Sequence, residues 1–126
     1  MPSEGETIKT GKASDVGVHL VDEDGKSLYL FEKDSGPKST CYGACGRVWP
    51  PVTTSGTPKA EGGAKASRLS TTKRRDGKSQ VVYAGHPLYY YAREKAGTAK
   101  GQGLDQFGAE WYVLTPSGKK LEKGES

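Results

Sequence analysis

The sequence has few aliphatic residues, few histidines and few cysteines. Hydrophobic residues make up 33% of the 126, with two Cys and two His. No apolar run is long enough to span a bilayer as a helix. With so few histidines, most schemes of hydrolytic catalysis lack the general base that they need. The shortage of aliphatic side chains predicts a thin core that depends on aromatic rings.

Aromatic residues and glycine are the features that are present. The chain holds seven Tyr, two Trp, two Phe and 18 Gly. The aromatics occur in short runs between turn residues, a pattern typical of an all-β domain and not of a disordered chain. No segment keeps the helical spacing of three and four for long enough to predict a sizeable helix. A length of 126 residues suits one domain.

The net charge is +4, from 19 basic and 15 acidic residues. An excess of this size favours weak attraction to anionic surfaces such as cell-wall polymers or lipid head groups. It is too small to predict nucleic-acid binding. Lys73, Arg74 and Arg75, with Arg68 and Lys78 nearby, form a basic cluster at a predicted turn. Two interpretations stay open for it, namely contact with an anionic polymer or lipid and a solvated hairpin tip.

The chain contains an internal repeat. A shift of 60 residues places Tyr29 on Tyr89 and brings Trp49 within two residues of Trp111. Each unit reads as a hairpin, a loop and a Trp. Because a lone hairpin cannot bury its own face, the two units are expected to pack against each other.

A rival shift of 52 residues aligns two Asp-Gly-Lys-Ser tetrapeptides, at 24–27 and 76–79. That match is perfect but short, and it separates the aromatic strands, so the shift of 60 is preferred. Asp-Gly is a strong turn signal in both copies. The first copy lies between strand-like runs at 17–22 and 27–32, which predicts a hairpin there.

These patterns predict an all-β fold, in which two hairpin-based repeats pack as a small antiparallel sandwich or barrel-like domain. The domain spans residues 16–118, with repeat 1 at about 16–52 and repeat 2 at about 67–118. Residues 1–15 are polar and are predicted to be a flexible tether. Residues 119–126, rich in Lys and Glu, are predicted to be a flexible tail.

The combined motifs resemble a known family. The first repeat carries Leu28-Tyr29-x-Phe31-x-x-Asp34, followed by Cys41-x-Gly43-x-Cys45-x-x-x-Trp49-Pro50-Pro51. The second carries Gly85-His86-Pro87-Leu88-Tyr89-x-Tyr91, then Gly101-Gln102-Gly103 and Trp111. Over about residues 16–118 the chain is similar to bacterial secreted-repeat lipoproteins of unknown function, which are marked by a Tyr-x4-Asp motif.

The resemblance implies a place outside the cytoplasm, either secreted or attached to the membrane by a lipid anchor just upstream of the domain. It implies no settled activity. The 126 residues contain no export signal. The anchor is therefore expected to lie outside this sequence.

Cys41 and Cys45 allow two interpretations. A structural disulfide in an oxidising compartment is favoured. The alternative is a copper-handling or electron-transfer protein, in which both thiolates and His86 or His19 hold the metal. The C-x3-C spacing alone carries little weight, and no thioredoxin-like pattern surrounds it. No cofactor or metal is predicted, with copper as the alternative.

The motif residues Tyr29, Asp34, Tyr89, Glu94 and Trp49 are predicted to be structural. A Tyr–Asp pair can serve acid–base chemistry. An Asp after a strand more often accepts backbone N–H groups in the following turn, while the Tyr faces the core. Glu94 replaces the Asp of the motif in repeat 2, and with its longer side chain the same turn is not expected there.

Tyr89, Tyr90, Tyr91 and Trp111 are the candidate ligand-binding residues. Alternation along a strand puts Tyr89 and Tyr91 on one face and Tyr90 on the other. One face belongs to the core, and the other is predicted to be a stacking platform for a sugar, a quinone or a flat cofactor.

The sequence therefore predicts a non-catalytic extracytoplasmic lipoprotein domain that binds an unidentified small ligand or cell-envelope partner. Nucleic acid is not expected as a partner, and contact with the membrane is expected only through the lipid anchor. No catalytic constellation is recognisable, so an enzyme is the least supported class.

Overall fold

The computed structural model describes residues 6–13 and 16–121. It is nearly all β, which confirms the predicted fold class. Two short helical segments interrupt the strands, α1 (Ala44–Val48) and a 3-10 helix (Ala66–Arg68). The strands are β1 (Thr7–Ala13), β2 (Gly17–Asp22), β3 (Tyr29–Phe31), β4 (Lys59–Ala60), β5 (Leu69–Lys73), β6 (Ser79–Tyr83), β7 (His86–Pro87), β8 (Asp105–Gln106) and β9 (Ala109–Val113).

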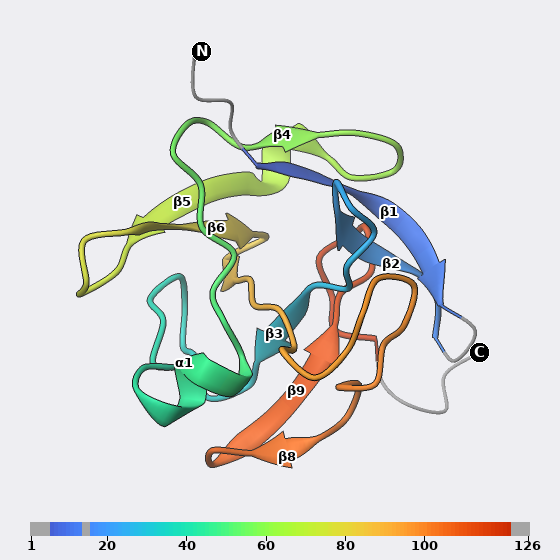
Figure 1. The fold of residues 1–126 in the computed structure, drawn as a ribbon. Helices are drawn as coiled ribbons and strands as arrows, with labels where there is room; N and C mark the ends of the chain where they lie inside the picture. The colour runs from blue at the N-terminus through green and yellow to red at the C-terminus, as the bar shows by residue number, and fades with distance from the viewer. Residues whose placement is uncertain (1–5, 14–15, 122–126) are drawn as a thin grey trace.

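The strands form three small sheets, in the orders β2-β1-β4, β3-β9-β8 and β5-β6-β7. The pairings are antiparallel except that β4 runs parallel to β1. Figure 1 shows β1 and β2 on one side of the molecule and β5 and β6 on the other, with β3 and β9 below and between them. Over the described residues the sheets do not close into a barrel.

The predicted N-terminal tether is wrong for Thr7–Ala13. These residues form β1, which pairs with β2 from Ile8↔Asp22 to Ala13↔Gly17. Its middle residues are only partly buried or exposed, so its polar sequence gives no hydrophobic alternation from which to predict a strand. The β1–β2 pair in repeat 1 corresponds to the β5–β6 hairpin in repeat 2. Repeat 1 therefore begins at β1 and not at 16, while residues 1–5 and 14–15 lie outside the described chain.

The predicted C-terminal tail is also wrong at its start. The N–H of Leu121 donates to the carbonyl of Val113 at 2.9 Å, and Lys120 forms a β-bridge with Leu114. These contacts fold the chain back on β9 after the turn at Gly118. Residues 122–126 lie outside the described chain.

The two Asp-Gly pairs form turns, as their sequences predict. Gly25 and Gly77 have φ of 89° and 90°, in the region that glycine enters without steric strain. The first hairpin is shorter than predicted, because only Val21 bridges Ser27 across the turn. The chain then leaves β2, and β3 pairs with β9. All three residues of β3 are buried, so the strand lies inside the molecule and not at its surface.

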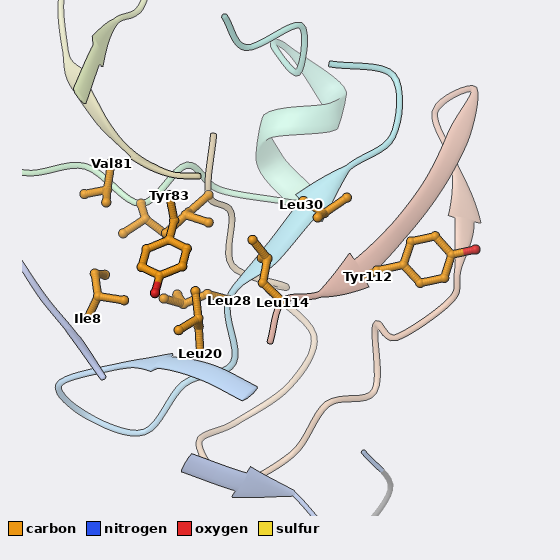
Figure 2. Close-up of a cluster of buried hydrophobic side chains, with 10 residues drawn as sticks. Ile8, Leu20, Leu28, Leu30, Val81, Tyr83, Tyr112 and Leu114 are labelled. Carbon is orange, nitrogen blue, oxygen red and sulfur yellow. The ribbon is translucent and has the colours of Figure 1, made fainter. Parts of the chain in front are cut away.

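The core has two parts. One is mostly aliphatic, which corrects the expectation of a core that depends on aromatic rings. Figure 2 shows how its side chains gather between the strands. It consists of Ile8, Leu20, Leu28, Leu30, Val52, Val81, Tyr83, Leu88, Tyr112 and Leu114. The other part is rich in aromatic side chains and contains the motif residues Tyr29, Trp49 and Tyr89.

Candidate functional site

Four aromatic rings stack in a row through the centre of the second core. Phe31 lies on Trp111 with ring centroids 3.9 Å apart, and Trp111 lies on Trp49 at 3.9 Å with 5° between the ring planes. Tyr91 stacks on the other face of Trp49 at 4.5 Å. The outer members, Phe31 and Tyr91, are related by the 60-residue shift. Both indoles are fully buried, so the stack is an internal structure with twofold character.

Tyr29 and Tyr89, which the 60-residue shift also relates, pair with each other. Their backbones exchange two hydrogen bonds, from the N–H of Tyr29 to the carbonyl of Tyr89 at 2.8 Å and in reverse at 2.9 Å. The Tyr29 ring meets Trp49 edge-on at 5.2 Å, and the Tyr89 ring meets Trp111 edge-on at 5.1 Å. Each repeat thus contributes one half of an almost symmetric arrangement.

The Tyr-x4-acid motif is completed between repeats and not within one. The Tyr29 hydroxyl donates to Glu94, at 2.9 Å from Oε1 and 2.8 Å from Oε2. The Tyr89 hydroxyl donates to Oδ2 of Asp34 at 2.7 Å. The acid of each motif therefore accepts from the tyrosine of the other. We call these two contacts the crossed pairs.

Each motif acid also holds the loop that follows it. Asp34 Oδ1 accepts the N–H of Thr40 at 2.8 Å, and Glu94 Oε1 accepts the N–H of Lys100 at 2.6 Å. Both contacts span six residues. The expectation that Glu94 would not hold its turn is wrong, because Glu94 accepts both the Lys100 N–H and the Tyr29 hydroxyl, as Asp34 accepts both Thr40 and Tyr89.

Burial fixes the protonation of the crossed pairs. It raises the pKa of Tyr29 and Tyr89 far above that of an exposed phenol, and the facing carboxylate raises the pKa of each further. Both hydroxyls therefore stay protonated and act as donors. Burial also raises the pKa of Asp34 and Glu94, against their hydrogen bonds. The crossed pairs therefore suit a structural role, in which they hold the two repeats together.

The predicted disulfide is confirmed. Cys41 and Cys45 are joined with Cα atoms 5.2 Å apart, and both are buried beneath the aromatic core. The disulfide removes the thiolates on which the copper alternative with His86 depends. Over the part of the chain that the structure describes, no cluster of three His, Cys, Asp or Glu side chains is placed to hold a metal.

The structure buries two of the four residues of the predicted stacking platform and leaves the other two partly exposed. Tyr89 and Trp111 are fully buried, so they cannot offer a face to a ligand; aromatic packing between the repeats covers them. Tyr90 and Tyr91 are half-buried, and they point to different parts of the core, as alternation predicts. Only these two remain candidates for ligand contact.

The side chains of the basic cluster do not form one continuous surface. Arg74 is buried, and its guanidinium donates to Gln80 Oε1 at 2.9 Å and to the Cys41 carbonyl at 3.3 Å. Arg75 lies outside, over the ring of Tyr42 at 4.0 Å. Arg74 lies 4.4 Å from the centroid of the same ring. Two consecutive arginines thus contact Tyr42, one from the interior and one from the surface.

A pocket of about 400 Å³ opens beside Tyr42. It lies between the loop after Asp34 and the β5–β6 turn. Every lining side chain is cationic or carries a hydroxyl. The lining consists of Lys38, Ser39, Thr40, Tyr42, Lys73 and Arg75, and we call it the Tyr42 pocket.

A family model described as a secreted repeat of unknown function matches residues 10–53 and 70–115. The chain belongs to this family. The first match begins within β1 and the second within β5, in agreement with the structural repeat. The family places the domain outside the cytoplasm, and it indicates no catalytic activity. No curated protein and no solved structure matches the chain.

The two histidines of this secreted repeat lie apart from the Tyr42 pocket. His19 is buried, with Nδ1 2.8 Å from the Gly17 carbonyl and Nε2 2.8 Å from Ser27 Oγ. Burial lowers the pKa of His19 and that of His86. Among the described residues, no helix is long and apolar enough to cross a bilayer.

Tyr42 is the functional candidate that the sequence did not reveal. It stands between two cysteines, and the cysteines dominate any interpretation of that segment. Its partners Arg74 and Arg75 lie more than 30 residues away, and the Arg75 N–H donates to the Tyr42 hydroxyl at 3.1 Å. The basic cluster was the only signal that pointed toward this site.

Proposed function

We propose that this secreted repeat is a non-catalytic binding module that holds a phosphate-bearing polymer of the cell envelope in the Tyr42 pocket. The observation that carries the proposal is the lining of this pocket. Lys38, Lys73 and Arg75 bring three cationic groups to one cavity of about 400 Å³. The net charge of +4 adds a general attraction to polyanions.

The residues of the Tyr42 pocket suit phosphate chemistry. Ammonium and guanidinium groups form short charge-assisted hydrogen bonds with phosphate oxygens. The Thr40 hydroxyl already donates to Oδ1 of Asp34 at 2.6 Å, and the Ser39 hydroxyl lies 2.5 Å from that of Tyr89, so the cationic side chains are the donors that a phosphate would meet. Two acids lie near the cationic side chains in sequence. Asp34 accepts from Thr40 and from the Tyr89 hydroxyl, and the Asp76 carboxylate accepts from Nε of Arg74 at 3.2 Å. Because Asp76 is engaged there, Arg75 and Lys73 keep their charge available to a ligand.

The pocket wall is held in place before any ligand arrives. Tyr42 lies inside the short loop that the Cys41–Cys45 disulfide closes. Arg74 ties the same loop to β6 through Cys41 and Gln80. A preorganised wall reduces the conformational entropy lost on binding. Tyr29, Tyr89 and both indoles are fully buried, so this proposal uses the loops around Tyr42.

Membrane attachment fits the same proposal. The family is secreted, and an upstream lipid anchor would keep the domain at the envelope, where phosphate-bearing polymers occur. The anchor raises the local concentration, so weak binding by one domain is sufficient for retention.

The test is titration with inorganic polyphosphate, followed by calorimetry at low and moderate salt. The variant combines Lys38→Ala, Lys73→Ala and Arg75→Ala. The matched control removes the same charge elsewhere, with Lys12→Ala, Arg93→Ala and Lys95→Ala. We expect the pocket variant to bind polyphosphate at least about tenfold more weakly than the control, because it lacks the cationic side chains that contact phosphate. Its affinity should also depend less on salt, because fewer phosphates are neutralised.

Two results contradict the proposal. Equal weakening in the pocket variant and the control would mean that only net charge matters. Equal affinity of the unaltered protein for polyphosphate and for polyglutamate of the same length would mean that the pocket does not select phosphate.

A further inference from the structure

A second pocket lies on the other side of the motif, at Tyr90 and Tyr91. Its volume is about 130 Å³, the space of about four water molecules at about 30 Å³ each. A small organic molecule fits this space, and a sugar chain or a flat cofactor does not. The pocket is lined by Lys26, Ser27, Pro50, Tyr90, Tyr91 and Glu94, and we call it the Glu94 pocket.

The motif acids of the two repeats differ in the charged side chains that lie near them. In repeat 1 burial raises the pKa of Asp34, and the charge of the buried Arg74 acts against that rise. Arg74 Nη1 also donates to Ser39 Oγ at 3.1 Å. In repeat 2 the groups that act on Glu94 are hydroxyl and backbone N–H donors. Within residues 6–13 and 16–121, Glu94 forms no ion pair.

The Glu94 pocket lies beside the motif acid of repeat 2. Glu94 is half-buried, and its Oε1 already accepts from Lys100 and Thr98. Its Oε2 accepts the shared Tyr29 hydroxyl at 2.8 Å. Since a carboxylate oxygen has two lone pairs, Oε2 keeps capacity for a further donor. A half-buried carboxylate without a counter-ion favours a cationic ligand.

The rest of the pocket supplies the opposite charge and an apolar wall. The Lys26 ammonium lies 5.8 Å from the centroid of the Tyr90 ring. Tyr90 is fixed by its hydroxyl, which donates to Asp22 Oδ2 at 2.8 Å, and by its N–H, which donates to the Pro50 carbonyl at 2.7 Å. One small cavity thus combines a carboxylate, an ammonium group and a rigid aromatic surface.

We propose that the Glu94 pocket binds a small zwitterion of the amino-acid class, with the ligand ammonium at Glu94 and the ligand carboxylate at Lys26. The short side chain of the ligand packs against Tyr90, Tyr91 and Pro50. The volume restricts the class to the smallest members, such as glycine and alanine. This ligand site is distinct from the Tyr42 pocket, and it uses the two tyrosines of the predicted stacking platform that are not fully buried.

The test is a ¹H–¹⁵N NMR titration with alanine, ethylamine and propionate as separate probes. Alanine carries both charges, and each of the others carries one. We expect alanine to shift the amide signals of Ser27 and Tyr91 with a millimolar dissociation constant, in keeping with so small a ligand. Ethylamine and propionate are expected to bind at least about tenfold more weakly.

Two variants assign the charges. Glu94→Gln keeps one acceptor oxygen, which can serve Tyr29 and Lys100, but removes the charge, and Lys26→Ala removes the ammonium. Both are expected to weaken alanine binding by about tenfold, while the exposed controls Glu61→Gln and Lys12→Ala leave it unchanged. The Tyr42-pocket triple variant is expected to bind alanine normally, which separates this proposal from the proposed function. The proposal is overturned if alanine causes no shifts at up to about 100 times the concentration expected for half-saturation, or if Glu94→Gln binds it as well as the control.

Discussion

The Tyr29 hydroxyl donates to both carboxylate oxygens of Glu94, although 65 residues separate the two in the chain. Tyr89 and Asp34 form the matching contact in the opposite direction. A motif that reads as a local Tyr-x4-acid unit is therefore one half of a contact between repeats. Neither repeat satisfies its own motif, so the two repeats are expected to fold as one unit.

Removing the Tyr29 hydroxyl should destabilise the protein. Tyr29→Phe leaves the half-buried Glu94 without its phenol donor, and the free energy of unfolding should fall by about 1–3 kcal/mol. Tyr91→Phe is the control, because the Tyr91 hydroxyl makes no hydrogen bond within the described chain and repeat 1 has Phe31 at this position. Urea unfolding followed by tryptophan fluorescence measures both. A smaller loss for Tyr29→Phe than for Tyr91→Phe would contradict the assigned role.

Gly101 should tolerate no side chain. A Cβ at this position would lie 2.7 Å from Cη2 of Trp49 and 3.1 Å from Cζ of Tyr29. Gly101→Ala should therefore lower the stability by about 1–3 kcal/mol through overpacking. At Gly46, where the nearest atom would be 3.8 Å away, the same change should be harmless. Thermal unfolding of the two variants makes the comparison, and equal melting temperatures would argue against close packing on Trp49.

Loss of the disulfide should affect both stability and the Tyr42 pocket. Cys41 and Cys45 are four positions apart, and closure of so short a loop stabilises by about 2 kcal/mol in the chain-entropy description. The double variant Cys41→Ala/Cys45→Ala should lose this amount in urea unfolding. It should also bind polyphosphate more weakly, because Tyr42 loses its constraint. Unchanged polyphosphate affinity in the folded variant would mean that the disulfide does not shape the pocket.

His19 should make the protein less stable in mild acid. Burial lowers the pKa of His19 below its usual 6.5, so the unfolded chain takes up a proton before the folded one does. The stability that His19 contributes above pH 6.5 is then lost as the pH falls from 6.5 toward its folded-state pKa. When the pH is lowered from 7.5 to 5.5, the midpoint of urea unfolding should fall further for the natural protein than for His19→Gln. An equal fall in both would show that His19 does not titrate in this way.

The parts of the fold that depend on local chemistry could be predicted from the sequence. Asp-Gly at Gly25 and Gly77 marks turns because glycine adopts a positive φ easily. Trp49 is fully buried, in keeping with its predicted structural role in a chain short of aliphatic side chains. The Cys41–Cys45 disulfide follows from close spacing and the extracytoplasmic setting that the family resemblance implies.

The parts that depend on distant partners could not be predicted. β1 has a polar sequence, and its pairing with β2 makes it a strand. The identity of the acid that faces Tyr29 depends on how two repeats pack, which no local pattern encodes. Tyr42 acquires its role from Arg74 and Arg75, whose separation into a buried and a surface side chain follows only from the folded turn.

A double-mutant cycle tests the crossed pairs most directly. Tyr29→Phe is combined once with Glu94→Ala, its partner in the other repeat, and once with Asp34→Ala, the acid of its own motif. Urea unfolding of each variant gives the two coupling energies. We predict about 1 kcal/mol or more for Tyr29 with Glu94, and a value near zero for Tyr29 with Asp34. Strong coupling within the motif, with none between the repeats, would contradict the account.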